Sequence, residues 1–195
     1  MEKTPGKRTS PAPFTTSTLQ QAASSRLGFS LNRVMSAAQS LYEGGHITYM
    51  RTDSVVLSED ALNDIESQIK SDYGKEYSNR KTYKSKSKGA QEAHEAIRPV
   101  YAKNKVAGDS DDCRRLYDLI WKRTIASQMS DAKIERTTIK TNISGLKEKF
   151  ITKGEVISFD GFLKLYTPDS SKNEDDSGLL PNLKQNDILT TSEIK

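Results

Sequence analysis

The sequence predicts a mainly α-helical domain followed by an antiparallel β segment. Between residues 14 and 130, apolar residues recur at the spacing of amphipathic helices, and a serine or threonine stands before each such stretch. After Ala132 the pattern changes to a β-branched stretch of alternating residues, which is typical of strands. We therefore place the boundary between the two parts near Ser130 and Asp131.

Four helices are expected in the first part, over residues 15–26, 30–43, 58–73 and 110–129. The candidate N-caps are Thr15 or Ser17, Ser30, Ser58 and Ser110. Glycine follows each of the first three helices, where a left-handed residue commonly ends a helix. In the fourth helix, Trp121 and Tyr117 add aromatic bulk against the neighbouring helices.

A short strand, Ile47-Thr48-Tyr49, is expected directly after the second helix, where it would hold Tyr49 on a packed scaffold. The later strands are expected over 134–143, 149–152, 155–159 and 187–190, with an acidic loop over 169–178. Residues 1–13 are rich in Pro, Lys, Ser and Thr, which predicts a linker or disordered end. The expected domains are this end, a helical domain over 14–130 and a β segment over 131–195.

Composition excludes several classes of protein. The chain has 195 residues, 34% of them hydrophobic, and a mean hydropathy of −0.72, which predicts one modest core. The single cysteine, Cys113, excludes an intrachain disulfide and a cysteine zinc cluster and fits a reducing compartment. The N-terminus lacks the apolar region of an export signal, and no apolar run approaches the roughly 20 residues of a membrane span. We expect a cytoplasmic protein with no membrane partner.

The net charge of +4 is unevenly distributed along the chain. Residues 1–105 hold 16 Lys and Arg against 11 Asp and Glu, whereas residues 106–195 hold 14 against 15. The richest run, Arg80 to Lys88, has five basic residues and no acidic one, and we interpret it as a solvated loop with a secondary role in touching DNA phosphates. A sequence pI near 9.0 is compatible with nucleic acid but is common among ordinary proteins.

Tyr49 and Arg51 form the most informative pair in the sequence. In extended backbone, residues two apart point to the same side, so the phenol and the guanidinium could reach one ligand. Arginine presents a fork of donors that matches phosphate oxygens, and a phenol can act as a covalent nucleophile. By itself the pair also fits a packed ring beside a solvated charge, because such pairs are common in half-buried strands.

Three segments in order carry a resemblance to a known family. Residues 13–24 read PFTTSTLQQAAS, residues 45–54 read GHITYMRTDS, and residues 91–99 read QEAHEAIRP. Together they resemble the type IA DNA topoisomerases, and most closely the bacterial members. The resemblance runs from about Pro13 through Met129, and more loosely through Phe159-Asp160-Gly161 to the C-terminal end.

The resemblance implies a mechanism and a set of partners. Tyr49 would attack the DNA backbone, form a 5′-phosphotyrosyl link and release a 3′-hydroxyl, and resealing would need no ATP. Arg51 would stabilise charge on the non-bridging phosphate oxygens. The enzyme would act on single-stranded segments of negatively supercoiled duplex DNA in the nucleoid, together with the remaining domains of the topoisomerase. In the family, the β segment belongs to an arch-forming domain, so it is expected to be an incomplete sheet with exposed edges.

Two residues of the third segment are further site candidates. We predict that His94 contacts phosphate or relays a proton near Tyr49. Arg98 either binds DNA or braces the motif through Glu95 or Asp53. Asp53 and Ser54 are expected to cap the turn and fix Arg51, and His46 is interpreted as a packing residue. Val100 departs from the serine or threonine usual in the family, which puts a hydroxyl contact there in doubt.

The family's metal-binding domain is absent from this sequence. Type IA enzymes place acids of the Asp-x-Asp type before this region and use Mg²⁺, whereas Asp109, Asp111 and Asp112 are better interpreted as complementing a helix N-terminus. Mg²⁺ is therefore expected for the full enzyme, with ligands outside this chain, and the chain is expected to be a multidomain α+β topoisomerase fragment that cannot cleave DNA alone. Two alternatives remain: a non-catalytic DNA-binding helical module, and a protein-interaction domain.

Overall fold

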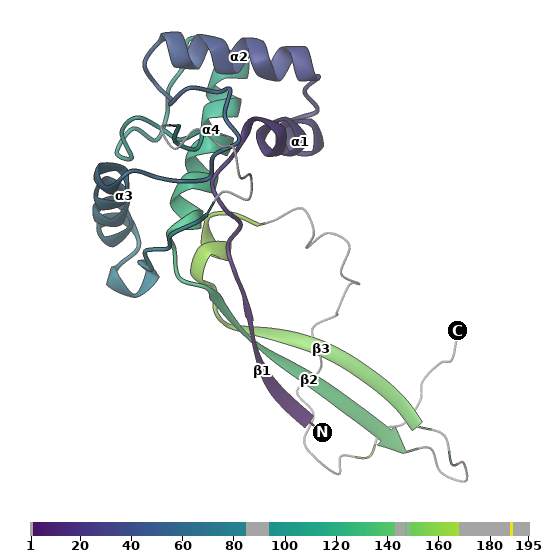
Figure 1. Cartoon of the computed structure of the whole chain (residues 1–195). Coiled ribbons are helices and arrows are strands. Elements are labelled where there is room, and N and C mark those ends of the chain that lie inside the picture. The colour runs from purple at the N-terminus through teal and green to yellow at the C-terminus, as the bar shows by residue number, and fades with distance from the viewer. Residues whose placement is uncertain (1, 85–93, 143–146, 148, 168–187, 189–195) are drawn as a thin grey trace.

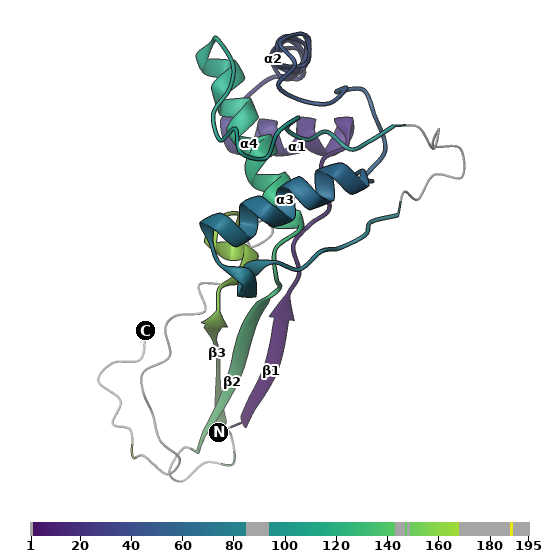
Figure 2. The same ribbon diagram turned by 90° about the vertical axis from the view of Figure 1, so that its left-hand side faces the viewer.

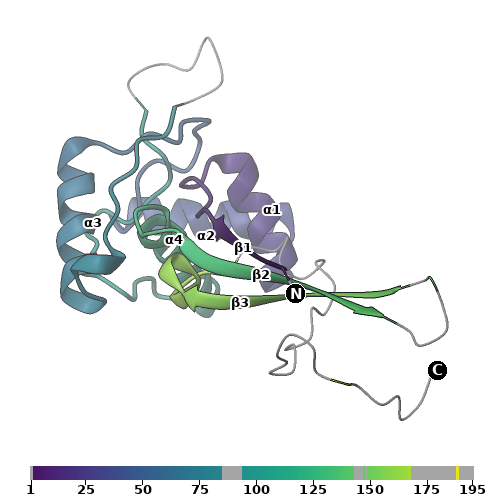
Figure 3. The same ribbon diagram turned by 90° about the horizontal axis from the view of Figure 1, so that it is seen from below.

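The computed structural model describes residues 2–84, 94–142, 147, 149–167 and 188 of the chain. These residues form four α-helices and a three-stranded antiparallel sheet. Figure 1 shows the helices gathered at one end and the sheet projecting away from them. Views from the side and from below show the same arrangement, with the sheet leaving the helices from one end (Figures 2 and 3). The predicted combination of helices and an antiparallel sheet is confirmed.

The four helices begin at the caps that the sequence predicted. They are α1 (Thr16–Leu27), α2 (Leu31–Glu43), α3 (Glu59–Asp72) and α4 (Asp111–Ser127). Each N-cap side chain accepts a hydrogen bond from the backbone N–H three residues later, which satisfies one donor that the first helical turn leaves open. At α1 the arrangement is a full capping box, because the Thr18 hydroxyl also accepts from the Thr15 N–H.

The core lies among the helices, with α4 packed against α1 and α2 (Figure 1). Its largest fully buried side chains include Tyr117, Phe14, Phe29, Phe162, Leu19 and Leu41. Trp121 is buried as well, and its indole N–H donates to the Ala102 carbonyl at 2.8 Å, so its polar atom is satisfied. None of the helices in the described part of the chain is both long and apolar enough to span a bilayer.

The sheet has the strand order β1–β2–β3 and includes the N-terminal segment. Its strands are β1 (Glu2–Arg8), β2 (Ala132–Asn142) and β3 (Lys149–Phe159). The expectation of a linker or disordered end over 1–13 was therefore wrong for Glu2–Arg8, which pairs antiparallel with β2 from Thr138 back to Ala132. An ion pair between Lys3 and Glu135, at 2.7 Å, adds to this pairing, and a second between Arg8 and Glu155, at 2.8 Å, links β1 to β3.

The third strand differs from its prediction in length. The two strands expected over 149–152 and 155–159 form the single strand β3, in which the buried Gly154 lies opposite Thr137. Within the described sheet β1 and β3 are the edges, and β3 exposes Phe150, Ile151 and other apolar side chains. The acidic loop expected over 169–178 and the strand expected over 187–190, apart from Ile188, lie outside the described residues.

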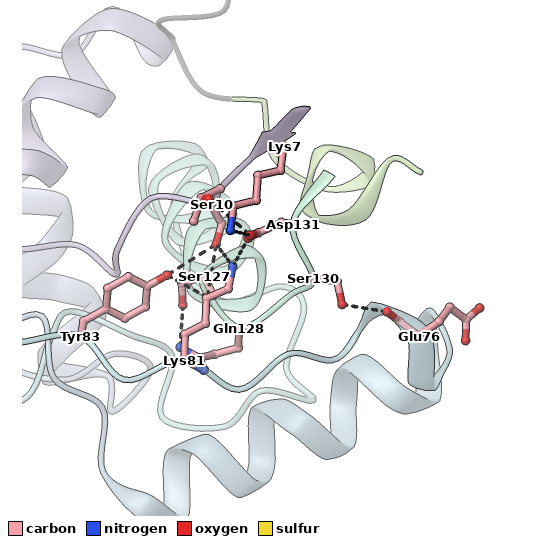
Figure 4. A network of polar contacts seen from close by, with 10 residues as sticks. Lys7, Ser10, Glu76, Lys81, Tyr83, Ser127, Gln128, Ser130 and Asp131 are labelled. Atoms are coloured by element: carbon pink, nitrogen blue, oxygen red, sulfur yellow. Dashed lines mark hydrogen bonds and ion pairs between the residues drawn. The ribbon is translucent and has the colours of Figure 1, made fainter. Parts of the chain in front are cut away.

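A polar network joins the sheet to the helices where α4 passes into β2 (Figure 4). The Lys81 ammonium contacts the Asp131 carboxylate at 2.7 Å and donates to the Ser10 hydroxyl at 3.1 Å. The Tyr83 hydroxyl donates to the Ser127 carbonyl at 3.0 Å. Three segments far apart in the sequence are thereby held together at the junction.

The basic run was only partly predicted correctly. Lys81 is largely buried in the junction and pairs with Asp131, so it is structural rather than solvated, whereas Arg80 is exposed and pairs with Glu59 on the surface. Their acidic partners come from segments distant in sequence, which is why the local run appeared to be an unpaired loop. Lys84 is exposed, and Lys86 and Lys88 lie outside the described residues.

Arg123 of α4 binds the segment that follows β3. The Arg123 guanidinium lies over the Phe14 ring, 4.6 Å from its centroid, and donates to the Tyr166 hydroxyl at 2.9 Å. Tyr166 follows the short helix η2 (Gly161–Lys164) and is buried. This contact links the end of the sheet to α4 and to the segment before α1.

Gly161 lies close against the backbone of Ser130 and Asp131 at the junction. It has φ +50, and a Cβ built there would lie 2.4 Å from the Ser130 carbonyl oxygen. We predict that Gly161→Ala lowers the free energy of unfolding by roughly 2 to 4 kcal/mol, because both backbone strain and overlap must be relieved. Urea denaturation would measure this change.

Gly28→Ala is the matched control for this experiment. Gly28 also has positive φ (+69), but no atom lies within 4 Å of a Cβ built there. Gly28→Ala should lower the free energy of unfolding by only about 1 kcal/mol, which is the cost of placing an alanine in the left-handed conformation. If Gly161→Ala and Gly28→Ala lowered the free energy of unfolding equally, the close approach to Ser130 would contribute nothing to the cost of the Gly161 substitution.

Candidate active site

The turn after α2 returns the chain toward the helix it has just left. Gly45 has φ +68, and its N–H donates to the Tyr42 carbonyl at 2.9 Å. The His46 N–H donates to the Leu41 carbonyl, also at 2.9 Å. These two bonds form a Schellman motif, which requires a left-handed residue at Gly45. The turn therefore sets the direction in which residues 46–51 leave the helix.

The segment before Tyr49 pairs with the segment after His94. The Thr48 N–H donates to the Arg98 carbonyl and the Val100 N–H donates to the His46 carbonyl, both at 2.9 Å. The Thr48 hydroxyl donates to the Ala96 carbonyl at 2.7 Å and accepts from the Arg98 N–H at 2.9 Å. One threonine thus clamps two segments that are about fifty residues apart.

The strand predicted over Ile47-Thr48-Tyr49 was too long. The structure has a single bridge between Ile47 and Pro99. Proline has no backbone N–H, and the Arg98 N–H is taken by the Thr48 hydroxyl rather than by a backbone carbonyl, so the ladder does not continue. Tyr49 lies just beyond this bridge, on irregular backbone.

Burial alternates along the segment that carries Tyr49. Tyr49 and Arg51 are exposed, whereas Met50 and Thr52 are buried, which agrees with the prediction that Tyr49 and Arg51 share one side. The N-terminus of α1 anchors this segment. The Thr16 hydroxyl donates to the Met50 carbonyl at 2.7 Å and accepts from the Thr52 N–H at 2.9 Å.

The structure brings His94 to Tyr49, as predicted. Their ring centroids are 6.4 Å apart. A second ring, that of Tyr42 near the end of α2, contacts Tyr49 edge-on at 5.2 Å. The sequence did not single out Tyr42, because it appeared only as one of the residues at helical spacing in α2. The sequence did not single out Thr48 either, because its role depends on a partner far along the chain.

Arg98 braces the motif through Glu95, one of the alternatives the sequence left open. Its guanidinium contacts the Glu95 carboxylate at 2.6 Å, and its side chain is only 13% exposed. The Glu95 carboxylate also accepts from the Ser58 N–H at 2.6 Å, which ties the motif to the start of α3. Burial favours the protonated form of Glu95, but the hydrogen bonds from Ser58 and Arg98 outweigh it and hold its pKa below the usual range. A direct contact between Arg98 and DNA stays a prediction.

Arg51 remains available to a ligand. In the part of the chain that the structure describes, its guanidinium has neither a hydrogen bond nor an ion pair. Ser54 caps the turn, as expected, by accepting from the Val56 N–H at 3.2 Å, but its hydroxyl makes no bond to Arg51 among the described residues. His46 packs its ring against Tyr117, with centroids 6.4 Å apart, as expected of a packing residue.

The acidic residues at the start of α4 do not fit a magnesium site. The Arg33 guanidinium contacts both carboxylate oxygens of Asp112 at 2.6 Å and holds its pKa below the usual range. Ser110 is occupied as the helix cap. Among the described residues, no group of three or more His, Cys, Asp or Glu side chains is placed to hold a metal ion.

The arrangement supplies three groups suited to phosphate chemistry. A phenol, a guanidinium and an imidazole come from Tyr49, Arg51 and His94, and they are carried by two segments that the Thr48 hydroxyl joins. A phenol has an ordinary pKa of about 10, so attack on phosphorus requires a proton acceptor or nearby cations. An imidazole can provide the acceptor, and a guanidinium can stabilise phosphate oxygens.

Comparisons with known proteins agree on one family. A family model described as DNA topoisomerase matches residues 1–195. DNA topoisomerase 1 of Streptomyces coelicolor is 43% identical over 206 residues, covering 100% of this chain and 22% of the relative. DNA topoisomerase 1 of Pasteurella multocida is 44% identical over 193 residues, covering 97% of this chain and 22% of the relative.

A solved structure shares the fold. Full-length topoisomerase I from Thermotoga maritima aligns with a TM-score of 0.75 and 36% sequence identity, over 92% of this chain and 30% of that chain. The chain therefore spans about a fifth to a third of the length of these relatives.

The Glu95–Arg98 pair gives a test of how the site is held. Glu95→Gln should lower the free energy of unfolding at pH 7 by about 1 to 3 kcal/mol, because the largely buried Arg98 loses its anion. Because the pKa of Glu95 is lowered by folding, its contribution is complete above the ordinary glutamate pKa of about 4.3 and is lost as the pH falls further. The difference in the free energy of unfolding between the wild-type protein and Glu95→Gln should therefore shrink below about pH 4.3.

Thermal or urea unfolding at several pH values would measure this. Glu66→Gln is the matched control, because Glu66 pairs with Lys70 on the exposed surface of α3 and should contribute little. A Glu95→Gln protein as stable as the Glu66→Gln protein at pH 7 would contradict the bracing role.

Proposed function

Because this chain belongs to the type IA DNA topoisomerase family, we propose that it is the tyrosine-bearing segment of an enzyme that transiently cleaves one DNA strand. One observation supports this assignment above the others. Tyr49 is exposed at the point where the Thr48 clamp joins two of the family's motifs, with the His94 ring beside it and Arg51 two residues further on. A phenol in this position is both accessible to DNA and held on a packed scaffold.

In the proposed reaction, the Tyr49 hydroxyl oxygen attacks the phosphorus of a backbone phosphodiester. The bond from phosphorus to the 3′ oxygen breaks, so the 5′ phosphate becomes joined to Tyr49 and a 3′-hydroxyl is released. His94 accepts the phenolic proton, and a proton is returned to the departing 3′ oxygen. Arg51 stabilises the negative charge that develops on the non-bridging oxygens.

Resealing is the same reaction in reverse. The 3′-hydroxyl attacks the phosphotyrosyl phosphorus and releases the Tyr49 phenol. One phosphodiester is exchanged for another at each step, so no ATP is consumed. Between the steps a second strand passes through the gap, and negatively supercoiled DNA is relaxed.

We further propose that the isolated chain cannot complete this reaction. The chain covers only 22% of the length of DNA topoisomerase 1 of Streptomyces coelicolor, and Mg²⁺ would be held by a domain outside these 195 residues. The helical part over 14–130 would carry the catalytic tyrosine, and the β segment would belong to the arch with strands contributed from elsewhere. The protein would work in the cytoplasm, at the nucleoid.

The nucleophile can be tested by reconstitution. The chain would be mixed with a separately made portion of a type IA enzyme that carries the metal-binding and gate domains, together with Mg²⁺ and end-labelled single-stranded DNA. After denaturation, labelled protein is expected with the wild-type chain, none with Tyr49→Phe and none with the chain alone. Tyr101→Phe is the matched control, because Tyr101 is also exposed and should still form the adduct.

Two results would contradict this proposal. An adduct that persists in Tyr49→Phe would place the nucleophile elsewhere. The absence of any adduct, in pieces shown to associate and to bind DNA, would favour the non-catalytic DNA-binding module.

Arg51 gives an independent test of the transition-state role. We predict that Arg51→Ala lowers the cleavage rate of the complete enzyme about 100- to 1,000-fold, because a positioned donor to the reacting phosphate is lost. Its stability should be unchanged, since the side chain bonds no described residue. Arg51→Lys should recover only part of the rate, because lysine keeps the charge but lacks the planar fork. A full rate in Arg51→Ala would exclude the role.

A further inference from the structure

We propose that Tyr42 is a positioning residue for the Tyr49 nucleophile. Its ring meets the Tyr49 ring edge-on, with centroids 5.2 Å apart and an angle of 61° between the planes. This T-shaped geometry is a favoured one for aromatic pairs. The inference rests on the proposed function, because it assigns a role to Tyr42 only if Tyr49 attacks DNA.

The Tyr49 phenol needs something to hold its direction. About 40% of Tyr49 is exposed, and within the described residues no hydrogen bond to its hydroxyl is present. Its direction therefore depends on ring contacts, of which the described chain offers two. The Tyr42 ring is the nearer, at 5.2 Å against 6.4 Å for His94.

Tyr42 is itself well placed to serve as a fixed support. It belongs to the last turn of α2, next to the fully buried Leu41. Its carbonyl accepts the Gly45 N–H in the turn that follows, so the backbone on both sides of the ring is held. The same turn sends the chain back so that Tyr49, seven residues later, reaches the Tyr42 ring.

The chemistry gives the contact a consequence for the rate. In-line attack on phosphorus requires the attacking oxygen to face the bond that breaks, and effective concentration falls when the nucleophile samples other directions. A ring contact that restricts Tyr49 raises the fraction of bound complexes able to react. It acts on the rate constant of cleavage and not on the affinity for DNA.

The alternative is that Tyr42 contacts DNA directly. Tyr42 is 41% exposed, and exposed aromatic rings can stack on unpaired bases. Such a role would appear in the affinity, because stacking stabilises the bound complex itself. A purely structural role would appear in the stability of the free protein.

The test uses the complete parent enzyme carrying Tyr42→Ala or Tyr42→Phe, with single-stranded DNA and Mg²⁺. Single-turnover cleavage at saturating DNA, the Kd for DNA and the melting temperature would be measured for each. Tyr42→Ala should lower the cleavage rate constant about 3- to 10-fold without changing the Kd, and it should lower the melting temperature only slightly because the ring is 41% exposed. Tyr42→Phe should restore the wild-type rate, because the contact needs the ring and its hydroxyl bonds no described residue.

The controls separate this inference from the proposed function. Tyr101→Ala removes an exposed ring that does not touch Tyr49 and should leave the rate unchanged. A wild-type rate in Tyr42→Ala, a raised Kd as its main effect, or a Phe variant as slow as the Ala variant would each overturn the positioning role. If Tyr49→Phe still cleaves, the proposed function fails as well; if only Tyr42→Ala behaves as wild type, the inference alone fails.

Discussion

The Thr48 hydroxyl makes the interaction on which the rest of the site depends. It donates to the Ala96 carbonyl and accepts from the Arg98 N–H, and it does so one residue before Tyr49 and two to four residues after His94. A side chain in this place replaces a strand ladder, which Pro99 would interrupt in any case. The result is a short, irregular crossing of residues 46–49 with residues 96–100, which exposes the Tyr49 phenol while the backbone around it stays hydrogen-bonded. A valine at position 48, which has the same shape but no hydroxyl, would leave the Ala96 carbonyl and the Arg98 N–H without these hydrogen bonds.

Each neighbouring element stabilises this crossing from a different side. The Schellman turn at Gly45 sets its entry, the start of α1 holds its exit through Thr16, and the Glu95–Arg98 pair ties the opposite segment to the start of α3. The sheet is connected through a separate junction, where Lys81 and Asp131 meet and Gly161 passes close to Ser130. The site is thus assembled within the helical part, and the sheet contributes no side chain that the structure places near Tyr49.

The sequence predicted the helices well because their signals are local. Ser30 and Ser58 cap the helices that were assigned to them, and glycine follows where a helix ends. The N-terminal strand was missed because its pairing partner lies about 130 residues away, and because Pro5 and Gly6 are both rare in strands although an edge strand tolerates them. For the same reason the sequence could place Glu95 among the partners of Arg98 but could not choose it, and it could not show that Tyr42 touches Tyr49. These contacts depend on how the turns orient the segments, which no local pattern encodes.

We propose that Tyr49, exposed where Thr48 joins the two segments, is the residue that becomes bonded to DNA. This proposal is tested most directly by trapping the cleaved complex of the complete enzyme, digesting both protein and DNA, and locating the nucleotide-bearing peptide by mass spectrometry. We expect a nucleotide attached through its 5′ phosphate to Tyr49 within the peptide that ends at Arg51. A nucleotide on any other residue, or a 3′ attachment, would contradict the proposal.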